Sequence, residues 1–155
     1  MDAQTIEVLG RHRLTEELLE EDIEVALPVR DRGVDLVAYL EQGEEITRFC
    51  ARPIQMKAAR EAVFSIEKKY AKVPHLLLVF VWFVTEPAKT RFFALTYDEA
   101  VRVAEMMGYT DTASWQQGGK YAVTSVGSGL EDELKRHETT GNGERWRRIL
   151  DTTGC

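Results

Sequence analysis

Residues 33–40 read Gly-Val-Asp-Leu-Val-Ala-Tyr-Leu, and residues 53–59 read Pro-Ile-Gln-Met-Lys-Ala-Ala. Both stretches are rich in residues that favour β-strands, yet each holds polar side chains within an apolar run. In the second stretch, Gln55 and Lys57 share one face because side chains alternate along a strand. A Gly-containing turn separates the two stretches, which predicts an antiparallel hairpin that brings Asp35 near Gln55 and Lys57.

The rest of the chain predicts a single α/β domain over residues 1–155, with a mixed β-sheet flanked by helices. Its core is expected at about residues 3–108, followed by an irregular, helical tail at about 109–155. The patterns indicate helices at 3–21, 97–107, 130–138 and 144–150. They indicate strands at 23–27, 34–40, 46–58, 75–84 and 91–96, and a short strand or loop at 63–66. The 75–84 strand is almost entirely apolar, so we expect both of its faces to be buried.

The composition is that of a folded water-soluble protein. Apolar residues make up 44% of the chain and charged residues 30%, which argues against disorder. The longest apolar run, 76–84, is too short to span a bilayer, and the start of the chain lacks a secretory signal pattern. The two cysteines, Cys50 and Cys155, do not form a disulfide framework. We therefore expect a reduced, cytoplasmic protein that does not insert into a membrane.

Charge is unevenly distributed along the sequence. The net charge is −6 overall, but it is −8 over residues 1–50, +5 over 51–92 and −3 over 93–155. The middle third is thus a basic island in an acidic protein. One interpretation is a solvated face that offsets the acidic helix, and the other is a surface that contacts phosphates.

Asp35 lies in a run of strongly β-forming residues, where an unpaired buried carboxylate would be costly. Lys57 can supply a direct ion pair, which would make the two residues an ordinary, partly exposed pair on an outer sheet face. Alternatively, a divalent metal ion can bind Asp35 together with the neutral oxygen of Gln55. A metal-bound water beside a lysine is suited to attack a phosphodiester. The residue types alone leave both interpretations open.

The sequence Gly-Val-Asp-Leu-Val at 33–37, followed by Ile-Gln-Met-Lys at 54–57, resembles the active-site hairpin of the PD-(D/E)XK nuclease superfamily in a QxK variant. It is most similar to branches that include archaeal Holliday junction resolvase-like proteins and small bacterial members. The resemblance covers about residues 5–60, with weaker support to about residue 96. It implies a restriction-endonuclease-like core and a Mg²⁺- or Mn²⁺-dependent endonuclease that hydrolyses phosphodiester bonds, in DNA, as a homodimer.

The same resemblance implies a role for each residue of the motif. Asp35 would be the metal-ligating aspartate, and Gln55 holds the position usually taken by Glu or Asp. Lys57 would be the motif lysine, and the main-chain carbonyl of Met56 would be a further metal ligand.

The sequence departs from the family pattern at two positions. Gln55 is a neutral amide, which removes one negative charge from the expected metal site. The leading helix often supplies an acid, but the corresponding position falls near Arg11. Glu7, one turn earlier, and Glu16, further along, are candidates for that role, although both are equally read as solvated helix glutamates. Arg11 itself would be able to grip a phosphate.

Basic residues interleaved with aromatic ones follow the motif strand, a pattern that can track a nucleic-acid backbone. Together with Arg11, the candidate phosphate contacts are Arg60, Lys68, Lys69 and Lys72. The alternative is a set of lysines that covers a sheet edge. Two other functions remain open beside the nuclease: a non-catalytic nucleic-acid-binding module and a protein-interaction module on the same fold.

Overall fold

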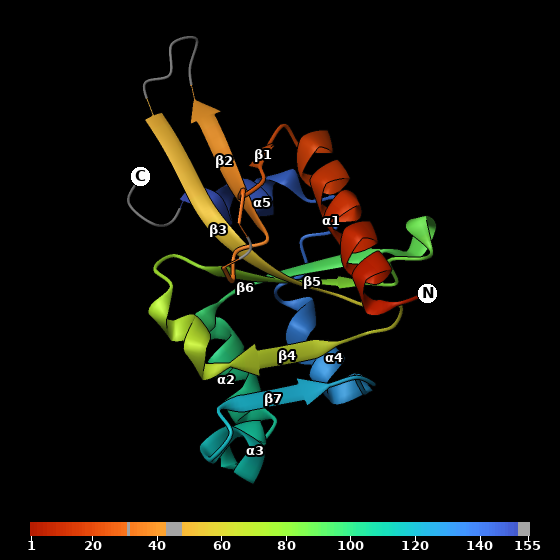
Figure 1. The fold of residues 1–155 in the computed structure, drawn as a ribbon, viewed down its shortest axis with the longest axis vertical. Coiled ribbons are helices and arrows are strands. Elements are labelled where there is room, and N and C mark those ends of the chain that lie inside the picture. Colours follow the sequence, from red (N-terminus) through yellow and green to blue (C-terminus); the bar gives the residue numbers. More distant parts are fainter. Residues whose placement is uncertain (31, 43–47, 152–155) are drawn as a thin grey trace.

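The computed structural model describes residues 1–30, 32–42 and 48–151 (Figure 1). Its helices are α1 (Ala3–Glu20), α2 (Tyr97–Met106), α3 (Ala113–Gln116), α4 (Ser128–Lys135) and α5 (Gly143–Asp151). Its strands are β1 (Glu24–Ala26), β2 (Leu36–Gln42), β3 (Arg48–Ala58), β4 (Phe64–Glu67), β5 (Leu77–Trp82), β6 (Arg91–Thr96) and β7 (Lys120–Val123). Short 3₁₀ turns are η1 (Lys68–Lys72), η2 (Pro87–Lys89) and η3 (Tyr109–Asp111).

Five strands form the main sheet in the order β1-β2-β3-β5-β6. Neighbouring strands are antiparallel except β3 and β5, which are parallel. The sheet is therefore mixed, and helices flank it, which confirms the predicted α/β class. Strands β4 and β7 pair separately as a two-stranded antiparallel sheet (Figure 1).

The β5 strand joins two hydrophobic cores, because its side chains alternate between the two faces of the sheet. Leu77, Val79 and Val81 belong to a first core, which α1 and α5 cover. Leu78, Phe80 and Trp82 belong to a second core, built with β4, α2, α3 and α4. All six β5 residues are buried, as the sequence predicts from their apolar character.

Helix α1 packs closely on β3 next to the predicted site. Asp2 caps its first turn by accepting a hydrogen bond from the Thr5 main-chain N–H at 2.8 Å. A side chain at Gly10 would collide with the Ala58 methyl and approach the Met56 side chain to 3.2 Å. Glycine is therefore needed at this helix position to bring α1 onto the strand.

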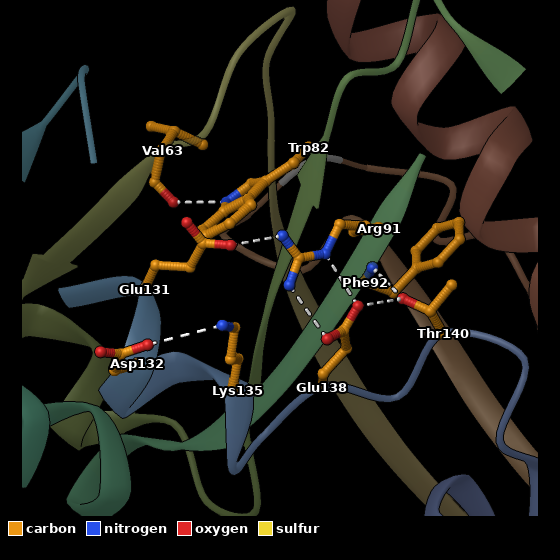
Figure 2. A network of polar contacts seen from close by, with 9 residues as sticks. All are labelled: Val63, Trp82, Arg91, Phe92, Glu131, Asp132, Lys135, Glu138 and Thr140. Atoms are coloured by element: carbon orange, nitrogen blue, oxygen red, sulfur yellow. Dashed lines mark hydrogen bonds and ion pairs between the residues drawn. The ribbon is translucent and has the colours of Figure 1, made fainter. Parts of the chain in front are cut away.

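The C-terminal third packs against the sheet through both apolar and polar contacts. Figure 2 shows Arg91 of β6 between Glu131 of α4 and Glu138. Its Nη1 lies 2.8 Å from Glu131 Oε1, while Nε and Nη2 donate to the two Glu138 oxygens at 2.9 and 3.0 Å. The guanidinium also lies 5.3 Å from the Trp82 ring centroid. This network fastens α4 and the chain that follows it to β6.

Several predicted boundaries and one pairing differ from the structure. Strand β2 begins at Leu36 rather than at residue 34, so Asp35 lies immediately before the strand. The short strand expected at 63–66 exists as β4, but it pairs with β7, which the sequence does not predict. Side chains of β7 are partly or fully exposed, so this strand lacks a clear apolar signal. The predicted hairpin turn falls on residues 43–47, outside the described residues.

The expectation of reduced cysteines is wrong for Cys50. It is buried at 1% exposure and carries a disulfide bond instead of a free thiol. The second cysteine, Cys155, lies outside the described residues. Within the part of the chain that the structure describes, no helix combines the length and apolarity that a bilayer span requires.

Candidate functional site

A cleft of about 1010 Å³ opens beside the β2–β3 hairpin. Its walls come from the start of α1, the residues around the β2 start and β3 end, the segment from β4 to η1, and the loop after β5. Six of the residues singled out from the sequence line it: Glu7, Asp35, Gln55, Met56, Lys57 and Arg60. A seventh, Lys69, lines it as well.

Asp35 is the most buried acid of the cleft, with 8% exposure. Its Oδ2 accepts a hydrogen bond from the main-chain N–H of Met56 at 2.6 Å and another from Gln55 Nε2 at 3.0 Å. The same Gln55 nitrogen lies 3.4 Å from the Met56 carbonyl oxygen. The hairpin therefore brings together a carboxylate, a main-chain carbonyl and a side-chain amide, which confirms the predicted proximity of Asp35 and Gln55.

Strand register explains this convergence. Leu36 pairs with Ile54, and the Asp35 N–H donates to the Ile54 carbonyl at 2.8 Å. Asp35 therefore lies opposite the residues that follow Ile54, and its side chain reaches Gln55 and the Met56 N–H. Just before it, Gly33 has φ +85°, a left-handed conformation that glycine adopts without strain. This glycine turns the chain into β2 at the edge of the cleft.

Two exposed basic side chains, Lys57 and Arg60, line the cleft. Neither makes an ion pair with any other described residue. Lys57 follows Gln55 on the same strand face, as predicted from alternation. Both positive groups are thus available to a negatively charged ligand that enters the cleft.

The cleft is also lined by Glu67, a polar residue that the sequence did not indicate as functional. Glu67, at the end of β4, forms an ion pair of 2.9 Å with Lys69. Tyr70 of η1 lines the cleft beside them. Burial raises the pKa of Tyr70 to about 12, and the negative charges of Glu67 and Asp35 contribute to the rise. At neutral pH its hydroxyl stays protonated and acts as a hydrogen-bond donor.

Helix α1 contributes Glu7, the candidate acid, together with Arg11. Glu7 lines the cleft, and its Oε1 lies 3.0 Å from Arg11 Nη2, one turn along the helix. Arg11 is not among the lining residues. The helix therefore offers a carboxylate to the cleft, while its arginine pairs with that carboxylate. Glu16 lies elsewhere and pairs with Arg13 at 3.5 Å.

Besides Arg11, two further predicted phosphate contacts lie outside the cleft. Lys68 places its ammonium 5.2 Å from the centroid of the Trp115 ring, an ordinary cation–π contact on the second core. Lys72 is exposed at the end of η1 and does not line the cleft. Of the predicted basic contacts, Arg60 and Lys69 are the two that the fold brings to the candidate site.

The sequence missed Glu67, Tyr70 and Thr124 as cleft residues. Glu67 ends a short strand whose partner the sequence does not predict, and Tyr70 follows that strand. Thr124 follows the partner strand, β7. The strands β4 and β7 are more than 50 residues apart in the sequence. The alternating pattern of β4 identifies Glu67 as a polar residue at the end of an apolar strand. No nearby sequence pattern predicts that Glu67 and Asp35 line the same cleft.

The family resemblance implies a divalent metal ion beside Asp35. Among the described residues, no group of three or more His, Cys, Asp or Glu side chains is arranged to hold a metal ion. Mg²⁺, however, commonly uses one or two carboxylates and completes its shell with waters and substrate phosphates. Asp35 and the Met56 carbonyl supply oxygens of that kind, whereas the Gln55 amide turns its Nε2 toward both of them. Gln55 would add a third oxygen after a half-turn of its amide, and the residues then fit such an ion when it is shared with a phosphate ligand.

Comparisons of the chain with protein-family models, curated proteins and solved structures find no match.

Proposed function

We propose that this protein is a metal-dependent nuclease that hydrolyses phosphodiester bonds, with DNA as its substrate. The observation that carries the proposal is the convergence of Asp35, Gln55, the Met56 carbonyl and Lys57 on one cleft. A helix followed by an antiparallel β1-β2-β3 meander, with β5 parallel to β3, positions these groups. That arrangement supports the restriction-endonuclease-like core implied by the PD-(D/E)XK resemblance.

Asp35, Gln55 and the Met56 carbonyl would hold Mg²⁺ or Mn²⁺. When bound, such an ion polarises the phosphoryl oxygen and lowers the pKa of a coordinated water. The Met56 N–H donates to Asp35 and so fixes the carboxylate in place. The short hydrogen bond to a main-chain group makes this orientation independent of any flexible side chain.

Lys57 would orient the attacking water and neutralise charge that develops on the phosphate. Arg60 and Lys69 would contact phosphates on either side of the scissile bond, because they lie on the cleft wall. Tyr70 would donate a hydrogen bond from its protonated hydroxyl to a phosphate oxygen. Glu7 would contribute a further carboxylate from α1 to the metal site, provided that its ion pair with Arg11 breaks.

A second function, nucleic-acid binding without cleavage, is favoured by one observation. The Asp35 oxygen is already satisfied by the Met56 N–H and the Gln55 amide, and only one carboxylate lies in the central cluster. A site of this kind can bind phosphates through Lys57 and Arg60 without holding a metal ion. It predicts salt-dependent nucleic-acid binding and no hydrolysis.

The proposal is tested by a cleavage assay with Mn²⁺ on linear and branched DNA and on RNA. We expect the wild-type chain to cleave DNA, and Asp35→Asn and Lys57→Met each to lose at least about 100-fold in rate. Lys72→Met is the matched control, because Lys72 is an exposed lysine outside the cleft. It is expected to cleave like wild type.

Equal cleavage by all four proteins would exclude Asp35 and Lys57 from catalysis. Cleavage that persists after chelation of divalent ions would exclude the metal. If the wild type binds DNA in a salt-dependent way but never cleaves it, the second function replaces the first.

A further inference from the structure

The Gln55 amide lies where the proposed cation would have to bind. Its Nε2 is 3.0 Å from Asp35 Oδ2 and 3.4 Å from the Met56 carbonyl oxygen. These are two of the three oxygens assigned to the metal ion. The Gln55 amide therefore donates hydrogen bonds to the Asp35 carboxylate and the Met56 carbonyl, the same two oxygens that a cation would bind.

The orientation of this amide follows from its neighbours. A carboxylate and a carbonyl oxygen only accept hydrogen bonds, so the NH₂ side of the amide must face them. The Gln55 Oε1 points the other way, toward Gly33, and lies 4.0 Å from where a Cβ on that residue would be. In this orientation Gln55 offers no oxygen to the cluster.

Serving as a metal ligand requires the opposite orientation. A half-turn about the terminal side-chain bond exchanges Nε2 for Oε1, which brings three oxygens together. Without a cation they repel one another, and the hydrogen bond to the charged Asp35 is lost. With only one carboxylate among the three ligands, the cluster leaves part of the ion's double positive charge unneutralised. A substrate phosphate supplies the missing charge and further oxygens.

We infer that Gln55 makes metal binding conditional on substrate: its amide closes the site in the free protein and rotates to ligate the ion only when a nucleic-acid phosphate is present. The inference rests on the proposed nuclease function and assigns its regulation. Free protein then holds a divalent ion weakly, which prevents the site from being loaded before substrate arrives. Because linkage is reciprocal, substrate strengthens metal binding by the same factor as metal strengthens substrate binding.

The test measures Mn²⁺ binding to the full chain by the electron paramagnetic resonance signal of free Mn²⁺. Titrations are run with and without a phosphorothioate DNA oligonucleotide that resists hydrolysis, and Mn²⁺ bound by the oligonucleotide alone is subtracted. We expect wild type to bind Mn²⁺ at least tenfold more tightly with the oligonucleotide. Gln55→Glu, which supplies a second carboxylate and removes the amide, is expected to bind Mn²⁺ at least tenfold more tightly than wild type when no oligonucleotide is present.

Two controls isolate the amide. Gln117→Glu adds the same charge at an exposed position outside the cleft, and it should bind Mn²⁺ like wild type. Asp35→Asn removes the carboxylate, and it should abolish the oligonucleotide-dependent gain. The wild-type comparison uses no substitution, so it stands even if a variant fails to fold.

Equal Mn²⁺ affinity of wild type with and without the oligonucleotide, alongside Mn²⁺-dependent DNA cleavage, would overturn the inference and leave the nuclease function intact. An unchanged affinity in folded Gln55→Glu would also overturn it. If no Asp35-dependent Mn²⁺ binding occurs under either condition, the metal site itself is refuted, and the inference with it.

Discussion

At the scale of single residues, the most informative side chains are polar groups on or next to strand β3, of which Asp35 and Arg52 are buried. Asp35 and Gln55 could be predicted as neighbours, because period-two alternation and one hairpin fix which residues share a face. Arg52 could not be predicted. It occupies an inward position of β3 and is only 2% exposed. Its partners are main-chain carbonyls far away in the sequence, for which no local pattern exists.

Arg52 joins three parts of the fold. Its Nε donates to the His75 carbonyl at 2.9 Å and its Nη1 to the Ile149 carbonyl at 2.7 Å. Burial lowers the pKa of Arg52 from the usual arginine value, because the charged guanidinium is removed from water. The two carbonyl oxygens replace part of the lost hydration by accepting its hydrogen bonds. The planar guanidinium reaches both acceptors at once, and a lysine ammonium on a flexible stem does not.

We therefore expect Arg52→Lys to lower the free energy of unfolding by about 1–3 kcal/mol, because one buried carbonyl loses its donor. Urea unfolding followed by circular dichroism measures the change. Arg102→Lys, on the exposed face of α2, makes the same substitution without these contacts and should leave the midpoint unchanged. Identical midpoints for both variants would show that Arg52 does not hold the three segments together.

At the scale of secondary-structure elements, the first helix and the main-sheet strands were predictable from local periodicity. The second sheet was not, because β7 has no buried side chain and pairs with the distant β4. The lining residues Glu67, Tyr70 and Thr124 lie on or next to this strand pair, so this part of the candidate site lay beyond local sequence patterns. Gly10 lies inside the predicted first helix, and the structure shows that this glycine lets α1 pack against β3.

The contact between α1 and β3 predicts a coupled pair of substitutions. Gly10→Ala places a methyl against Ala58, and we expect a loss of about 1–3 kcal/mol from overpacking. This loss should outweigh the gain of about 1 kcal/mol that alanine brings to a helix. Ala58→Gly removes the opposing methyl, so the double variant should be more stable than the two single losses predict.

Denaturant unfolding of the four proteins gives the coupling energy directly. Strictly additive losses would mean that the helix does not approach the strand at this point. A coupling energy of about 1 kcal/mol or more, in which the double variant loses less stability than the two single variants together, supports the close approach of α1 to β3 beside the cleft.

At the scale of the whole molecule, ionised carboxylates tie the C-terminal third to the sheet. The hydrogen bonds from Arg91 hold the pKa of Glu138 below its ordinary value of 4.5. A folded-state pKa below the unfolded one means that Glu138 stabilises the fold above the unfolded pKa. That contribution is lost as pH falls through the folded pKa. Glu17 has the opposite sign, because burial raises its pKa and its contribution is lost as pH rises.

Glu138 and Glu17 change stability in opposite directions as pH varies. A comparison of the melting temperatures of wild type and a Glu138 variant at each pH is therefore more informative than the pH dependence of wild type alone. Glu138→Gln mimics the protonated carboxyl at every pH. We expect its melting temperature at about pH 6 to be lower than that of wild type by about 2–8 °C, from a loss of about 1–2 kcal/mol. Toward about pH 3 the gap should close, since wild type then loses the same charge. Thermal unfolding across this range measures the effect. Glu144→Gln is the control, because Glu144 is an exposed residue of α5 whose carboxylate, among the described residues, pairs only with Arg148. A gap that stays constant with pH would show that Glu138 acts through its shape and not through its charge, and that the charged network does not fasten the C-terminal third to the sheet.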